Sequence, residues 1–539
     1  MTTLATSPRR WWALSALVLS VLVITLDGTI INVALPVLSD QLGATSTQLQ
    51  WIGGGYLLVF GAAMLPVGLL GDRYGHKRLL MLGLVIFGTA SAVGMMVHST
   101  GAVIAVRAFL GLGAALIMPL SMAMVPRIFS PKETQRAIGV WTAAAAAGLP
   151  FGPLIGGWLL EHYWWGSIFA FNLPVVVMAL AVSLPMLPSD GPVRRVDGQS
   201  FDLLGAGLGI TGITALVFGT IQVPRDGWGS PLVLTSLLGS VVLIVAFVVR
   251  ERRCAHPIVD LHLFANRSFS WGSLATVIVN FALMGLLFVV PQYLQALLGF
   301  DTFGTGWRLL PLIGGLMVAA TFSEQLVPRF GARRVVPVGL VVLGAGMLVG
   351  TTTGAGSGYG LTATWLSIAG LGFGFAVVPS TSMVLSSLPR EGAGQGSSLL
   401  ETLQQLGSAL GVALLGSVLT AGYLGRLSTA GLDADSARAA RDSVIGAVQV
   451  AGSLHDEALL ASARGAFLHG MTLILVTGAV LTMISAVLAG LFMPSGAGRA
   501  SSDQADSDHR GDTPEEVAPE GSAPNRIDLD RSEAADPVA

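Results

Sequence analysis

Long apolar stretches follow one another along almost the whole chain, with short polar connections between them. A helix needs about 20 mostly apolar residues to cross the hydrocarbon core of a bilayer. Fourteen stretches meet that requirement, so we predict an all-α membrane protein with fourteen transmembrane helices. The predicted spans are residues 13–37, 49–70, 79–98, 102–125, 137–159, 167–187, 202–221, 231–249, 269–291, 305–325, 335–353, 360–385, 396–420 and 467–492.

The composition excludes several classes of function. Of the 539 residues, 53% are hydrophobic and 11% are charged, whereas a soluble domain has about 25% charged residues. The single cysteine, Cys254, can form neither an intramolecular disulfide nor a thiolate metal site. No catalytic nucleophile motif, metal-ligand set or phosphate-binding loop is present. We therefore expect no enzyme activity, no cofactor, no metal and no nucleic-acid partner.

Basic residues are distributed unevenly between alternate connections. If the N-terminus is cytoplasmic, eighteen Arg and Lys residues fall in cytoplasmic segments between or before the spans and only six fall in external ones. Such a bias marks the cytoplasmic side of a membrane protein. We predict a multi-pass protein of a bacterial inner membrane with both termini in the cytoplasm.

Glycine and proline positions recur at a nearly constant distance along the chain. Gly111, Gly113, Gly148 and Gly152 are repeated at Gly370, Gly372, Gly407 and Gly411, an offset of 259 residues, and the segment 73–78 is repeated at 329–334. Many transporters are built from two such repeats. We predict a six-helix bundle in residues 1–190, a second in residues 261–494, and an inserted helix pair with its linkers in residues 191–260.

Two segments lie outside this repeat. Residues 495–539 are acidic and contain few large apolar side chains, so we expect a disordered cytoplasmic tail. Residues 421–466 form the longest external connection. They form either short amphipathic helices on the membrane surface or an ordinary helical loop, and we favour the second interpretation because amphipathicity is unspecific.

Asp27 and Arg107 are charged residues at membrane depth, near the middle of the first span and within the fourth. Charged side chains at this depth usually face a cavity or a partner. Burial favours the protonated form of a carboxylate and a nearby cation favours the charged form, so Asp27 is a candidate proton site. The alternative is a permanently paired structural carboxylate. Arg107 is the expected partner of Asp27.

Three further polar residues are candidates for substrate or proton binding. Glu401 lies about one turn into the thirteenth predicted span, Glu324 lies near the inner end of the tenth, and Asn32 follows Asp27 in the first. Each acid either adds a proton or attracts a cationic substrate, or it is an interfacial residue that reaches water.

Two glycine-containing segments have spacings that general membrane packing does not require. The first joins the second and third spans and contains Gly68, Asp72, Arg73, Gly75, Lys77 and Arg78. We interpret it as a conformational latch, against the alternative of simple cytoplasmic anchoring by its cations. The second lies in the fifth span and contains Gly148, Gly152, Pro153, Gly156 and Gly157. Small residues four apart allow close helix packing, and generic packing remains the alternative there.

In these residues the chain resembles the major facilitator superfamily, in particular its fourteen-span drug:proton antiporter family. Residues 68–78 resemble motif A, residues 107–114 resemble motif B, residues 148–157 resemble the antiporter motif C, and residues 26–36 resemble the acidic motif of the first span. The second copy of motif A departs from the pattern, with Pro328 in place of Asp72 and Glu324 in place of Gly68.

The resemblance implies a major facilitator fold and a proton-coupled efflux antiporter that works by alternating access. Asp27 and Arg107 would then couple protons to the export of small lipophilic, often cationic compounds, with the proton gradient as energy source and the protein a monomer in the bilayer. The alternatives are a dedicated exporter of one endogenous metabolite or antibiotic, a proton symporter, and a membrane receptor that no longer transports.

Overall fold

The computed structural model describes residues 9–188, 202–254, 259, 261–388 and 393–494. Only the backbone is described at positions 9, 65, 68, 69, 72, 131, 132, 135, 203, 324 and 393–395. The prediction of a disordered tail at residues 495–539 lies outside these residues. Within them the chain forms helices and no strand, which confirms the predicted all-α class.

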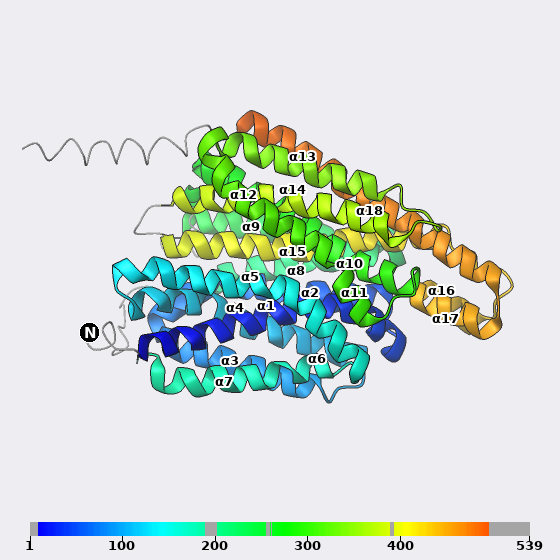
Figure 1. Cartoon of the computed structure of the whole chain (residues 1–539), viewed down its shortest axis with the longest axis horizontal. Coiled ribbons are helices and arrows are strands. Elements are labelled where there is room, and N and C mark those ends of the chain that lie inside the picture. The colour runs from blue at the N-terminus through cyan, green and yellow to red at the C-terminus, as the bar shows by residue number, and fades with distance from the viewer. Residues whose placement is uncertain (1–8, 189–201, 255–258, 260, 389–392, 495–539) are drawn as a thin grey trace, which may run out of the picture. The chain divides into compact units, whose positions relative to one another are not determined.

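Seven helices make up the first six spans (Figure 1). They are α1 (Arg9–Leu42), α2 (Ser46–Tyr74), α3 (His76–Gly94), α4 (Thr100–Ile128), α5 (Pro131–His162), α6 (Ser167–Ala170) and α7 (Asn172–Met186). A short interruption at Phe171 divides the sixth predicted span into α6 and α7. The inserted pair follows as α8 (Leu203–Asp226) and α9 (Pro231–Arg253).

The second half begins after a short 3₁₀ helix, η1 (Leu261–Ala265). Its helices are α10 (Arg267–Ala296), α11 (Thr302–Arg308), α12 (Leu310–Phe330), α13 (Ala332–Gly350), α14 (Tyr359–Ser386), α15 (Ala393–Leu424), α16 (Ala434–Asp442), α17 (Val444–Leu454) and α18 (Glu457–Phe492). The tenth predicted span is divided at Leu309 between α11 and α12.

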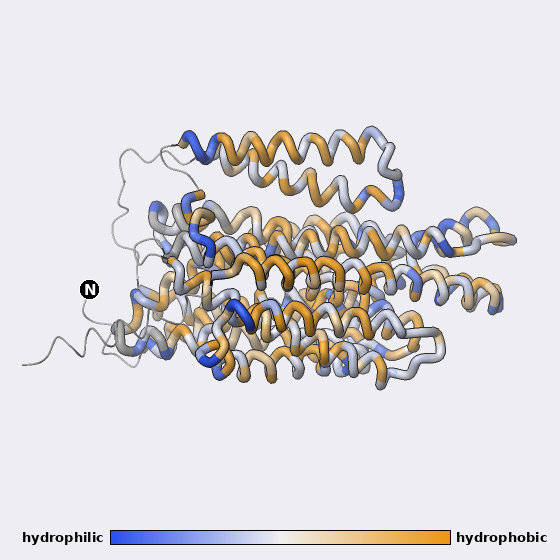
Figure 2. Tube along the Cα trace, turned by 90° about the horizontal axis from the view of Figure 1, so that it is seen from above, coloured by the Kyte–Doolittle hydropathy of each residue, from blue (hydrophilic) through white to orange (hydrophobic). Residues whose placement is uncertain are grey.

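All fourteen predicted spans coincide with helices. In the described residues, thirteen helical segments are long and apolar enough to cross a membrane, and the remaining prediction, residues 49–70, lies within the 29-residue helix α2. Apolar residues run along the helices while hydrophilic ones gather near their ends (Figure 2), as expected for elements that cross a bilayer.

The two halves use equivalent contacts. In the first half α1 packs on α4, α5 and α7, and in the second half α10 packs on α14, α15 and α18. The Lys77 ammonium donates to Leu184 O and Leu187 O at 2.8 Å each, near the end of α7. Arg333, 256 residues later, donates to Gly490 O near the end of α18 at 3.4 Å. A cation at a helix C-terminus is favourable, and here the same device recurs at the predicted repeat distance.

The halves contact one another through three helix pairs: α2 with α15, α5 with α11, and α1 with α10. Helix α8 packs against both α2 and α15, so the inserted pair lies beside a junction between the halves. At the start of α8 the Arg250 guanidinium donates to both oxygens of Asp202, at 2.8 and 2.9 Å. These hydrogen bonds hold the pKa of Asp202 below its usual range. The pair therefore stabilises the α8–α9 junction at neutral pH and stops doing so only as the pH falls through that lowered pKa.

Helices α16 and α17 form a cap at the end of the bundle where α1 ends and α2 begins, here called the capped end (Figure 1). The α17 helix packs on α1, α10 and α18, and so contacts both halves. Ser39 Oγ donates to Ser443 Oγ at 2.9 Å, and Ser46 Oγ donates to Asp442 O at 2.9 Å. The external connection is thus helical and packed.

The helices on either side of this connection are longer than predicted. Helix α15 continues to Leu424, and α18 begins at Glu457, whereas the sequence placed the start of the last span at residue 467. The carboxylate of Asp456 accepts a hydrogen bond from Leu459 N at 3.0 Å, which caps α18 at this earlier position.

Candidate functional site around Asp27

Asp27 and Arg107 form a buried ion pair between α1 and α4. Arg107 Nη1 donates to Asp27 Oδ2 at 2.6 Å, and the two side chains are 1% and 5% exposed, Arg107 being the more buried. Each residue was predicted to need a partner at membrane depth, and the fold places them together. Such pairs are held by Coulomb attraction in a medium that screens charge weakly, but both ions have given up hydration.

The second oxygen of Asp27 is bound by a residue that the sequence analysis missed. Asn172 Nδ2, from the start of α7, donates to Asp27 Oδ1 at 2.9 Å and lies 3.3 Å from Ser91 Oγ of α3. Asn172 is fully buried. A sequence signal existed, since an amide inside an apolar span needs partners, but the absence of charge made it inconspicuous. Asp27 is therefore held by α4 and α7 together.

Arg107 is fixed on its other sides by α2. Its Nε donates to Ile52 O at 3.1 Å, and its guanidinium carbon lies 4.1 Å from the centre of the Tyr56 ring. Gly111, one turn later in α4, allows this approach, because a Cβ there would lie 2.6 Å from Tyr56 O. Arg107 Nη2, Asn172 Oδ1 and Tyr56 Oη are buried and have no partner among the described residues. The site can therefore form further hydrogen bonds when a proton or small polar guest enters.

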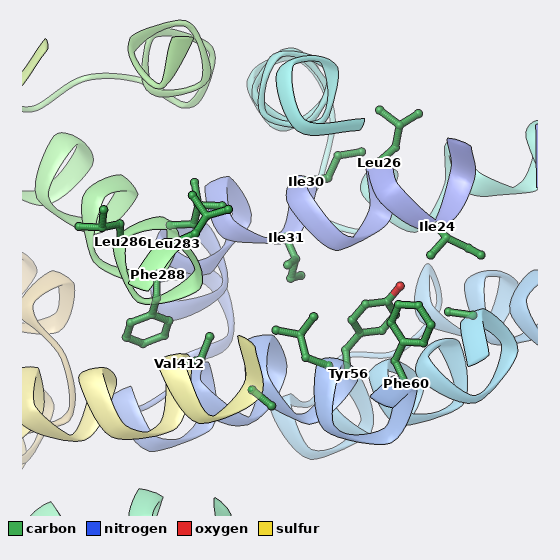
Figure 3. Packing of buried hydrophobic residues seen from close by; sticks show 14 of the residues in the cluster. Ile24, Leu26, Ile30, Ile31, Tyr56, Phe60, Leu283, Leu286, Phe288 and Val412 are labelled. Atoms are coloured by element: carbon green, nitrogen blue, oxygen red, sulfur yellow. The ribbon is translucent and has the colours of Figure 1, made fainter. Parts of the chain in front are cut away.

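An apolar core adjoins this site. Figure 3 shows Ile24 and Ile31 of α1 near Tyr56 and Phe60 of α2, with Leu283, Leu286 and Phe288 of α10 and Val412 of α15 beside them. The repeat offset of 259 residues pairs Asp27 with Leu286 and Arg107 with Leu366, both buried. The ion pair is thus a feature of the first half alone.

The glycines of the motif C segment join α5 to two other helices. Gly148 and Gly152 face Thr25 and Thr29 of α1, and Thr29 Oγ1 donates to Gly148 O at 2.8 Å. A Cβ at Gly156 would lie 2.9 Å from Ile30 Cγ2. Beyond it, on α5, Gly157 and Pro153 meet α11 of the second half, where Thr302 Oγ1 donates to Gly157 O at 3.0 Å and Gly306 contacts Pro153 O. This segment therefore links the Asp27 helix to the opposite half, and α5 stays continuous through both prolines.

The motif A segment is described only in part. Gly75 separates α2 from α3 with a φ of 100°, which glycine adopts readily. Lys77 binds the end of α7 as described above, and the exposed Arg73 lies 5.6 Å from the centre of the Tyr74 ring. Arg78 is exposed. The predicted roles of Gly68 and the Asp72 side chain lie outside the described residues, so the latch hypothesis stays a prediction.

The remaining predicted candidates do not join the Asp27 site. Asn32 is buried and its amide lies 3.4 Å from Gly28 O and Thr29 O of its own helix. Glu401 of α15 accepts a hydrogen bond from Gln405 Nε2 at 3.0 Å. The side chain of Glu324 lies outside the described residues.

Comparison with known proteins places this arrangement in a family. The sequence model of the Major Facilitator Superfamily matches residues 17–412. The tetracenomycin C resistance and export protein of Streptomyces glaucescens is 32% identical over 492 residues, which cover 89% of this chain and 91% of that protein. The multidrug efflux pump LfrA of Mycolicibacterium smegmatis is 30% identical over 494 residues, covering 91% of this chain and 97% of that protein.

Solved structures agree with the fold. A bacterial homolog of the human lysosomal transporter Spinster, in an inward-facing and unoccupied conformation, superposes with a TM-score of 0.64 at 18% identity, covering 91% of this chain and 100% of that chain. At that identity the likeness concerns the fold alone. Together with the family match, it identifies the chain as a multi-pass membrane protein that belongs to the major facilitator superfamily, a family of transporters.

Proposed function

We propose that this protein is a proton-coupled efflux antiporter that exports lipophilic, often cationic, drug-like compounds across a bacterial inner membrane. The observation that carries the proposal is the buried Asp27–Arg107 pair, in a chain whose relatives are named for drug resistance and export. We further propose a monomer with both termini in the cytoplasm, no cofactor, and the proton gradient as its energy source.

Protonation of Asp27 is the coupling step in this proposal. A proton on the carboxylate removes the charge that holds Arg107, while Ile52 O and Tyr56 still bind the guanidinium. Breaking a buried pair is worth about 3–5 kcal/mol, and a membrane potential supplies about 2.3 kcal/mol per charge for each 100 mV. The two quantities are of the same order, so proton binding is able to switch the relation between α1 and α4.

The contacts of α1 connect that switch to the whole molecule. Helix α1 packs on α5 through the motif C glycines, and α5 packs on α11 of the second half. A change in α1 therefore acts on a junction between the halves, where alternating access requires movement.

A dedicated exporter of one endogenous compound is the second candidate. It is favoured by the relative from Streptomyces glaucescens, whose name couples resistance to the export of a single compound, tetracenomycin C. The same proton switch serves either a broad or a narrow exporter.

The test is efflux of a fluorescent lipophilic cation from cells, with and without an uncoupler. We expect wild-type efflux that the uncoupler stops, and no such efflux for Asp27→Asn, because the amide cannot carry the proton. Asp226→Asn is the matched control, since this aspartate is exposed at the end of α8. Wild-type efflux that resists the uncoupler would contradict the proposal, and equal efflux by Asp27→Asn would remove Asp27 from it.

A further inference from the structure

Glu401 is a carboxylate within a predicted span that has no cationic partner. Its side chain on α15 is partly exposed, and its hydrogen-bond partner is the neutral amide of Gln405, at 3.0 Å. The ion pairs that the described residues form are Arg10–Glu133, Asp27–Arg107, Asp202–Arg250 and Arg438–Asp435, and none includes Glu401. A carboxylate in surroundings of low polarity strongly attracts a cation or a proton.

The position of Glu401 on α15 places it between the halves. Residues four apart share a helix face, and Gln405 meets α2, since a Cβ at Gly61 would lie 3.0 Å from Gln405 Cβ. The same face continues toward the capped end with Val412, which contacts Gly54 of α2. Leu414, on another side of α15, is 37% exposed. Glu401 therefore faces the junction of α15 with the first half, about 6 Å along the axis from Gln405.

Asp27 and Glu401 differ in what they already hold. Asp27 is neutralised by Arg107 and bound by Asn172, so a cationic ligand would have to displace a buried guanidinium to reach it. Glu401 offers an uncompensated carboxylate with an amide beside it. We propose that Glu401, oriented by Gln405, binds the positive charge of lipophilic cationic substrates, while Asp27 carries the proton.

This inference rests on the proposed export function and divides its two tasks between two carboxylates. It implies that neutral substrates do not need Glu401, because they bring no charge to compensate. Loss of Glu401 would then narrow the substrate range without stopping proton coupling.

The experiment measures direct binding to the purified full-length protein in detergent. Equilibrium dialysis compares tetraphenylphosphonium, a permanent lipophilic cation, with triphenylphosphine oxide, a neutral molecule of similar chemistry. We expect Glu401→Gln to weaken tetraphenylphosphonium binding at least about tenfold and to leave triphenylphosphine oxide binding unchanged. Glu401→Asp, which keeps the charge, should retain part of the affinity, and Glu457→Gln, at an exposed acid of α18, should retain all of it.

Three results would overturn the inference: wild type that does not bind the cation, a Glu401→Gln variant that binds it normally, or one that loses both ligands equally. Gel filtration checks that each variant is folded, and Glu401→Asp keeps the test decisive if Glu401→Gln is not. Binding requires no proton gradient. Charge-selective binding in a protein that shows no uncoupler-sensitive efflux would therefore uphold the role of Glu401 and refute the proposed export function.

Discussion

The carboxylate of Asp27 is enclosed by side chains from two other helices, and this arrangement explains how a charge is retained at membrane depth. Arg107 supplies the opposite charge, Asn172 supplies a second donor, and Tyr56 covers the guanidinium. Each partner compensates part of the hydration that Asp27 loses. The same enclosure makes the site sensitive to a single proton.

The sequence predicted the charged members of this site but not the neutral one. Asp27 and Arg107 stand out because ionised groups are costly in an apolar span. Asn172 lies near the edge of its predicted span and carries no charge, so only the tertiary fold reveals its contact with Asp27. Asn32 was predicted as a candidate, yet it lies against its own backbone, since sequence position does not fix the direction of a side chain.

Asn172 should position Asp27 without touching substrate. We expect Asn172→Leu to lower the maximal rate of uncoupler-sensitive export roughly tenfold, because an unpaired buried acceptor costs about 1–3 kcal/mol. The KM for substrate should change little. The measurement is the concentration dependence of dye export in inverted vesicles. A raised KM with an unchanged maximal rate would show that Asn172 acts on substrate instead.

At the scale of the helices, hydropathy was sufficient to locate all fourteen spans. The breaks at Phe171 and Leu309 were not predicted, because the residues on both sides are apolar and the hydropathy pattern continues across them. The cap of α16 and α17 was predicted only as helical. Its contacts with α1 and α10 join residues about 400 positions apart, such as Ser39 and Ser443, and local sequence patterns carry no information on such pairs.

The glycine stripe of α5 provides a test with an internal control. A Cβ at Gly152 would collide with Thr29 of α1, whereas a Cβ at Gly139 of the same helix meets nothing within 4 Å. Gly152→Ala should therefore destabilise the protein by about 1–3 kcal/mol through overpacking and abolish export. Gly139→Ala should be neutral or stabilising, since alanine favours a helix by about 1 kcal/mol over glycine.

Thermal unfolding of the two variants in detergent, read by gel filtration, distinguishes these expectations. Equal midpoints for Gly152→Ala and Gly139→Ala would mean that the α1–α5 contact is not as close as described.

At the scale of the whole molecule, the two halves share a framework but not their chemistry. Lys77 and Arg333 bind equivalent helix ends, while the buried ion pair occurs in the first half and the cap arises in the second. The offset of glycines predicted the shared framework. The division of chemistry follows from the residues at equivalent positions, such as Leu286 for Asp27, and was readable only once the offset was aligned with the fold.

The cap should restrain movement between the halves. Ser39 and Ser443 are buried with their hydroxyl oxygens 2.9 Å apart, a spacing at which two cysteines form a disulfide with little backbone movement. In a Cys254→Ser background, oxidation of the Ser39→Cys, Ser443→Cys double variant should stop export, and reduction should restore it. Each single variant should be unaffected. Full export by the quantitatively cross-linked protein would show that transport does not require this end to open.

The central claim is that Asp27 exchanges a proton for substrate, and proteoliposomes test it most directly. With the purified protein, an inward substrate gradient and an entrapped pH-sensitive dye, the account predicts proton movement opposite to substrate in wild type. Asp27→Asn should move no protons under the same gradient, although it still binds substrate. Substrate-driven proton movement of equal size in Asp27→Asn, or substrate transport by wild type without any proton movement, would contradict the account.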